Sequence, residues 1–155
     1  MGFLGGGPSP GKMREARDVE GLIALLGSKK ARVRDQASEA LVSLGAEAAP
    51  ALVAYVVAHG DRPGAPAILD PHYVTRTLAH VLLCEIGKPS IRAATNYLER
   101  TNDADEAEAA ALQITSLYGS LKIRIPDDVR DLIRVKAKRG DWDLVIRYND
   151  AELDR

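Results

Sequence analysis

The sequence predicts an all-α protein in which paired helices stack side by side. Aromatic residues make up only 5% of the 155 residues and alanine is frequent, a composition that suits closely packed helices better than a β-sandwich. Apolar residues recur at helical intervals in Val19–Leu26, and no segment alternates polar and apolar residues for long. A twelve-residue pattern also occurs three times, which indicates stacked structural repeats.

The repeated pattern covers the first helix of each expected pair. Arg34–Gly45 aligns with Arg76–Gly87 at an offset of 42 residues, and Glu108–Gly119 is a third copy that lacks the arginine. Ala37 and Ala79 take equivalent positions, where a bulky side chain would hold two helices apart. No such unit can bury its apolar face alone, so we expect the units to stack.

Local features of the sequence predict each of the expected helices. The three copies of the pattern lie at 31–44, 71–86 and 104–118, and the helices at 47–58 and 89–100 complete two pairs. The acidic start and basic end of the segment at 127–139 also suit a helix. Helices are therefore expected at 14–26, 31–44, 47–58, 71–86, 89–100, 104–118, 127–139 and 141–149.

Proline, acidic residues and glycine mark the ends of these helices. Asp70-Pro71 and Pro126-Asp127 precede helices, because proline and acidic residues are favoured in the first turn. The glycines that follow the three copies stand where a C-terminal cap favours a positive φ; they are Gly45, Gly87 and Gly119. The helix at 141–149 begins like the first one and would cap the stack.

The stretch "VRDQASEALVSLGAEAAPAL", residues 33–52, resembles a HEAT repeat of the short type that also occurs in phycobilisome-lyase-like proteins. The matching residues are Val33, Arg34, Ala37, Leu41, Gly45, Ala48, Pro50 and Leu52. The second copy departs from the family's pattern at Thr75 and Arg92, and the resemblance covers roughly residues 18–119. It implies a right-handed α-solenoid of about three to four HEAT-like helix pairs, with residues 14–155 as a single HEAT-repeat domain.

The first residues contain an apparent nucleotide motif. Gly6–Lys12 has the spacing of a phosphate-binding loop, but Met13 stands where such a loop needs serine or threonine. Pro8 and Pro10 remove two main-chain donors, and too little chain precedes them to form a buried strand. We interpret residues 1–13 as a flexible tether and the match as accidental.

Composition limits the classes of partner. The chain has 21 Lys and Arg against 22 Asp and Glu, a formal net charge of -1, which gives no overall attraction to nucleic acid or an anionic membrane. The single Cys84 cannot form an intrachain disulfide and suits a reducing compartment. There is no apolar run of about 20 residues and no signal-peptide pattern, so we expect a cytoplasmic protein without a membrane partner.

No catalytic or metal-binding set is apparent from spacing. His59, His72 and His80 share no metal-ligand spacing. Cys84 lies beside leucines and is interpreted as a small core residue, although in a lyase-like protein it could attach a bilin. We therefore expect a protein that is not an enzyme and carries neither a cofactor nor a metal.

Three features bear on binding. The uncharged helix at 48–58 is either covered by the loop at 60–71 or available to a partner, such as a second copy in a homodimer. Tyr55 and Tyr97 occupy equivalent second helices and could form a contact ladder on the concave side of the solenoid.

The third feature is a basic stripe on the helix at 127–139. Arg130, Arg134 and Lys138 follow each other at intervals of four residues. A solvated face explains this pattern best, but a stripe on the concave side could bind an acidic peptide or a phosphate backbone. The sequence thus predicts a non-catalytic protein-binding or scaffold module. The alternatives are nucleic-acid backbone binding through the stripe and a lyase-like HEAT protein.

Overall fold

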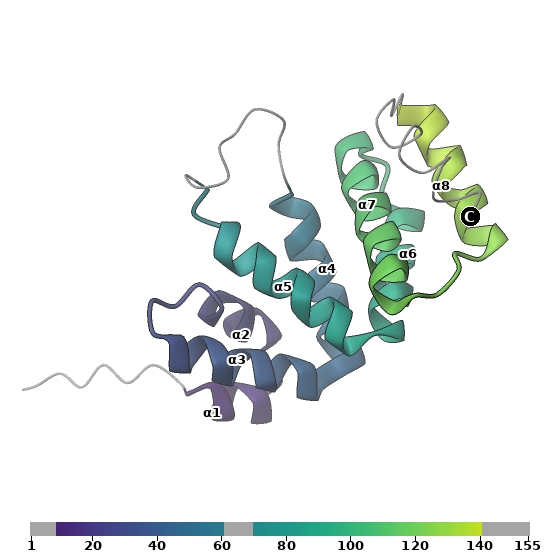
Figure 1. Cartoon of the computed structure of the whole chain (residues 1–155). Coiled ribbons are helices and arrows are strands. Elements are labelled where there is room, and N and C mark those ends of the chain that lie inside the picture. Colours follow the sequence, from purple (N-terminus) through teal and green to yellow (C-terminus); the bar gives the residue numbers. More distant parts are fainter. Residues whose placement is uncertain (1–8, 61–69, 141–155) are drawn as a thin grey trace, which may run out of the picture.

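The computed structural model describes residues 9–60 and 70–140, and in these two segments every regular element is a helix (Figure 1). The elements are α1 (Pro10–Glu15), α2 (Val19–Leu25), α3 (Ala31–Leu44), the 3-10 turn η1 (Gly45–Glu47), α4 (Ala49–Ala58), α5 (Tyr73–Ile86), α6 (Lys88–Arg100), α7 (Ala104–Leu121) and α8 (Asp127–Gly140). The prediction of an all-α fold is confirmed for this part of the chain. Three predicted features lie wholly or mostly outside the described residues. They are the helix at 141–149, the tether and the loop at 60–71.

The N-terminal region differs from the prediction of one helix at 14–26. The chain forms two short helices instead, because Arg17 takes a positive φ of 56° between them. Asp18 then begins α2, with its Oδ1 accepting a hydrogen bond from the Gly21 amide at 2.9 Å. Because α1 begins at Pro10, the last residues of the predicted tether at 1–13 are helical.

The repeated alanines lie in the core as predicted. Ala37, Ala79 and their counterpart Ala111 each have 0% of their surface exposed. A methyl group at these positions takes little space, so that neighbouring helices can approach each other closely there. The periodicity of small residues therefore reports the packed face of α3, α5 and α7.

Two of the three predicted glycine caps are confirmed. Gly45 and Gly87 end α3 and α5 with φ values of 53° and 81°. The prediction for Gly119 is wrong, because α7 continues through it to Leu121 and is ended by Lys122 in the left-handed conformation. Leu121 still packs against the core, and this contact accounts for the longer helix.

Three pairs of consecutive helices are in extensive contact with each other. These pairs are α2 with α3, α4 with α5, and α6 with α7. The chain bends by 109° between the segment of α3 and η1 and the following helix α4. The tight glycine turns therefore join neighbouring pairs of helices, and they do not connect the two members of one pair. This differs from the expected units, in which a tight turn joins the two paired helices.

The uncharged helix α4 lies at the centre of the described structure (Figure 1). It packs against α5, α6 and α7, and Ala49, Leu52 and Val53 are fully buried. Neighbouring helices thus bury much of its apolar surface. Most of the loop that was expected to cover it lies outside the described residues, and the homodimer stays a prediction. No helix in the described segments is alone long and apolar enough to cross a membrane; α3 with η1 and α4 meets that test only as the bent pair.

Candidate functional site

The candidate site is a groove between α6 and α8. Along the sequence, α4, α6 and α8 are every second helix, and α4 packs along α6. Between α6 and α8, by contrast, the two helices leave a groove of about 370 Å³. Its lining residues are Thr95, Glu99, Asp128, Val129, Asp131, Leu132 and Val135.

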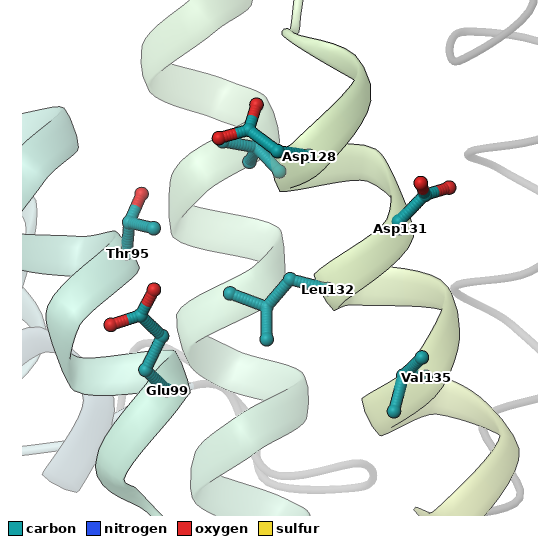
Figure 2. Close-up of a pocket in the computed structure, with 7 residues that line it drawn as sticks. Thr95, Glu99, Asp128, Asp131, Leu132 and Val135 are labelled. Atoms are coloured by element: carbon teal, nitrogen blue, oxygen red, sulfur yellow. The ribbon is translucent and has the colours of Figure 1, made fainter.

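The sequence of α8 explains how one helix forms both a wall of the core and a wall of the groove. Val129, Ile133 and Ala137, four residues apart, are buried and attach α8 to the core. The adjoining face carries Leu132 and Val135 toward the groove. Figure 2 shows Leu132 pointing from α8 toward the helix that carries Thr95 and Glu99.

All of the charged residues that line this groove are acidic. Asp131 has the Arg134 guanidinium at 3.8 Å. Within residues 9–60 and 70–140, no ion pair reaches Glu99 or Asp128. Burial, and after it the negative charge of Asp128, raises the pKa of Tyr118 above its ordinary value. The groove therefore carries an excess of negative charge next to apolar surface.

Lys136 fixes the position of α8 relative to α6. Its Nζ donates hydrogen bonds to the carbonyl oxygens of Thr101 at 2.7 Å and of Glu99 at 3.3 Å. These carbonyls lie at the C-terminal end of α6, where a cation is favoured by the helix dipole. Lys136 is thus a positioning residue for the two walls.

The predicted basic stripe lies outside the groove. Arg130 pairs with Asp127, and its side chain is only 15% exposed. Arg134 faces Asp131 and Lys138 is exposed to solvent. None of these three residues lines the groove, and carboxylates next to Arg130 and Arg134 reduce the positive charge that the stripe presents.

The two predicted tyrosines also lie outside the groove, but they do take equivalent roles. The Tyr55 hydroxyl is 2.9 Å from Nδ1 of His72, which precedes α5. Burial raises the pKa of Tyr97, and its hydrogen bond to Glu106 in the first turn of α7 raises it further. Each tyrosine therefore contacts the start of the following helix, which is a packing role.

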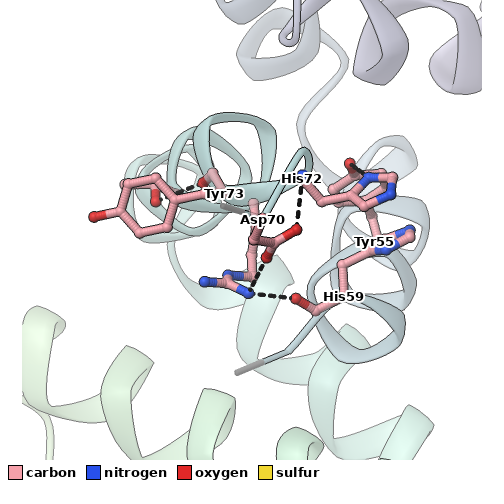
Figure 3. A network of polar contacts seen from close by, with 7 residues as sticks. Tyr55, His59, Asp70, His72 and Tyr73 are labelled. Atoms are coloured by element: carbon pink, nitrogen blue, oxygen red, sulfur yellow. Dashed lines mark hydrogen bonds and ion pairs between the residues drawn. The ribbon is translucent and has the colours of Figure 1, made fainter. Parts of the chain in front are cut away.

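Polar residues that include His59, Asp70 and His72 gather where α4 ends and α5 begins (Figure 3). Arg76 donates hydrogen bonds to the carbonyl oxygen of His59 at 2.6 Å and to Oδ2 of Asp70 at 3.0 Å. The rings of His59 and His72 stack with their centroids 3.9 Å apart. This cluster joins the two ends of the 59–72 connection and acts as a structural clamp.

A second polar cluster lies between α5 and α7 and was not predicted from the sequence. Nε2 of His80 is 3.8 Å from Cys84 Sγ and 3.3 Å from Ser116 Oγ. The buried side-chain amide of Gln113 holds Nδ1 of the same ring at 2.8 Å. The four-residue spacing of His80 and Cys84 was the available signal, since it places both on one helix face.

Cys84 is partly buried and packs against the core, in the setting expected of a small core residue. In the part of the chain that the structure describes, no three His, Cys, Asp or Glu side chains are grouped so as to hold a metal ion. The clusters around Arg76 and His80 therefore do not form a metal centre by themselves.

Comparison with known proteins gives no relative. No family model, no curated protein and no solved structure matches this chain. The resemblance to HEAT repeats consequently depends on the residues of this sequence alone.

Proposed function

We propose that the chain is a non-catalytic protein-binding module of the HEAT-repeat type. In this proposal it is a short right-handed solenoid whose concave side carries α4, α6 and α8, and a segment of a partner protein binds in the groove between α6 and α8. The observation that carries the proposal is the contrast between the filled space at α4 and α6 and the open space at α6 and α8.

The form of the groove supports a protein segment as its occupant. Its volume of about 370 Å³ is at the low end of the range of about 300–1,000 Å³ found for small-molecule sites. The groove is open to solvent and runs between two helices, which is the arrangement that receives a helix or an extended chain in many peptide-binding proteins.

An apolar residue on the rim gives the proposal further support. Val135 is 48% exposed on the groove side of α8. An exposed valine next to a groove contributes to binding when a partner removes it from water. Because Val81 on α5 is similarly exposed, at 52%, but does not line the groove, it provides a matched control.

Site-directed photo-crosslinking tests the proposal. A photoreactive amino acid is placed at Val135 or at Val81 in the full chain, and both proteins are irradiated in an extract of the source cell. We expect a discrete crosslinked protein from the Val135 position and none of that mass from Val81. Crosslinking from Val81 alone would contradict the groove as the binding surface.

Nucleic-acid binding receives less support. Arg130 is mostly buried and paired with Asp127, so Arg134 and Lys138 remain as the main contacts for a phosphate backbone. A mobility-shift assay at low salt, with Arg134→Ala/Lys138→Ala as the variant, tests this alternative. A salt-sensitive shift that the variant abolishes would favour it over protein binding.

A further inference from the structure

We infer that the groove between α6 and α8 binds a positively charged segment, one that presents lysine or arginine side chains together with apolar ones. The inference rests on the proposed function and adds the chemistry of the partner. It reverses the expectation from the basic stripe, which pointed to an acidic peptide or a phosphate backbone.

The charge that lines the groove has a single sign. Every charged residue that lines the groove is an acid: Glu99 from α6, and Asp128 and Asp131 from α8. All three are exposed, and in the described segments neither Glu99 nor Asp128 has an ion-pair partner. Unpaired carboxylates of like sign repel each other and an anionic partner, and a cationic partner relieves that repulsion.

Apolar surface lies beside these acids. Leu132 is half-buried and Val135 exposed, and both lie on the face of α8 that carries Asp128. Lysine and arginine place long apolar stems against such surface while their charged ends reach a carboxylate. The mixture of acid and aliphatic groups thus matches basic amphipathic segments better than purely polar ones.

The charge of the groove also disfavours other occupants. Residues 141–155 contain five acidic residues and two arginines, so this segment of the same chain would meet like charges in the groove. A second copy has a formal net charge of only -1, so it has no overall attraction to the acids. Nucleic acid and anionic lipid are repelled by the same carboxylates.

Two synthetic probes test the inference. They are fluorescein-labelled amphipathic peptides with the same pattern of leucines, one with lysine and one with glutamate at every polar position. Each is titrated with the full chain, and binding is followed by fluorescence anisotropy at low and at physiological salt. We expect the lysine peptide to bind at least about tenfold more tightly than the glutamate peptide, with a preference that decreases as salt increases.

Paired variants locate the binding. Glu99→Gln with Asp128→Asn should weaken the lysine peptide by about fivefold. The matched control, Glu39→Gln with Glu85→Gln, removes two exposed carboxylates from α3 and α5 and should leave the affinity unchanged. Val135→Lys should weaken it by about tenfold, and Val81→Lys should not.

Each outcome decides between the inference and its alternatives. Equal binding of the two peptides, or equal effects of the groove variants and their controls, would overturn the inference. So would the absence of any binding by the lysine peptide. If the photo-crosslink at Val135 still forms in those cases, protein binding stands and only the charge preference is wrong. If the crosslink fails as well, the proposed function is wrong.

Discussion

Arg34 and Arg76 make the same contact in successive helix pairs. Nη1 of Arg34 donates to the carbonyl oxygen of Ser28 at 2.7 Å, just beyond α2, and Nη1 of Arg76 donates to that of His59 at 2.6 Å, just beyond α4. Each arginine therefore joins its own helix to the C-terminal end of the preceding one. This shared contact gives a physical reason for the repeated arginine.

The third copy has Glu108 at the equivalent position and cannot donate such a bond. At the C-terminal end of α6 the carbonyl oxygens of Glu99 and Thr101 accept from Lys136 instead. A cation from the following helix α8 thus takes the place of the missing arginine. The three helix ends are satisfied in all three pairs, by two different routes.

We predict that Arg76→Ala destabilises the fold by about 2–4 kcal/mol. Arg76 is 9% exposed, and its loss leaves Asp70 and the His59 carbonyl without this donor. Arg34→Ala removes a contact at a partly exposed site and should destabilise by about 1 kcal/mol. The measurement is urea denaturation, with the exposed Arg92→Ala as the control, which should change the free energy of unfolding little.

Lys136→Met should loosen α8 while keeping an apolar stem of similar length. Two hydrogen bonds to main-chain carbonyls are lost, which we expect to lower stability by about 1–2 kcal/mol. The rate of amide hydrogen exchange should then increase more in α8 than in α4. Lys138→Met removes the same charge from an exposed position, and an equal effect of that variant would contradict the positioning role.

Tyr97 should contribute to stability in a pH-dependent way. Because burial and the hydrogen bond to Glu106 raise its pKa in the folded chain above 10.0, the folded state holds the proton more tightly than the unfolded state. Stability from this group is complete below pH 10.0 and decreases as the pH rises through the folded pKa.

Tyr97→Phe should therefore flatten part of the alkaline decrease in the free energy of unfolding. Chemical denaturation at a series of pH values from neutral to alkaline measures it. Tyr73→Phe, at an exposed position, is the control variant. A decrease of the same size in the wild type and in Tyr97→Phe would show that Tyr97 does not contribute.

Two glycine variants should change stability in opposite directions. Gly119 lies inside α7, and no other group lies within 4 Å of an added Cβ, so Gly119→Ala should stabilise by up to about 1 kcal/mol. Gly45 has equal space but a φ of 53°, and Gly45→Ala should destabilise by about 1–2 kcal/mol. Thermal unfolding of both variants distinguishes an internal glycine from a capping one. Stabilisation by Gly45→Ala would contradict the observed backbone conformation.

Helices and the small residues of the core could be predicted from the sequence because both depend on local periodicity. Ala37 and Ala79 were expected in the core and are fully buried. The break at Arg17 could not be predicted, since a positive φ at arginine has no sequence signal of the kind that glycine gives. Gly119 shows the opposite case, in which tertiary contacts of Leu121 extend a helix past a glycine.

The site was harder to predict than the fold. The basic residues of α8 were apparent from their spacing, but the same helix carries Asp128 and Asp131 on another face. Which face borders the groove depends on where α6 lies, and only the assembled structure fixes that. Likewise Lys136 is one of the basic residues in the sequence of α8, but its amine donates hydrogen bonds inside the molecule.

The amine of Lys136 also makes the geometry of the groove chemically addressable. It holds both walls of the groove together, yet it is not one of the carboxylates or apolar groups that a partner would meet. Acetylation of that amine would remove its charge and two of its three donors. The distance between the two walls would then be less fixed, while the residues that line the groove stayed the same. The rigidity of the groove and the chemistry of its lining could thus be varied separately in one protein.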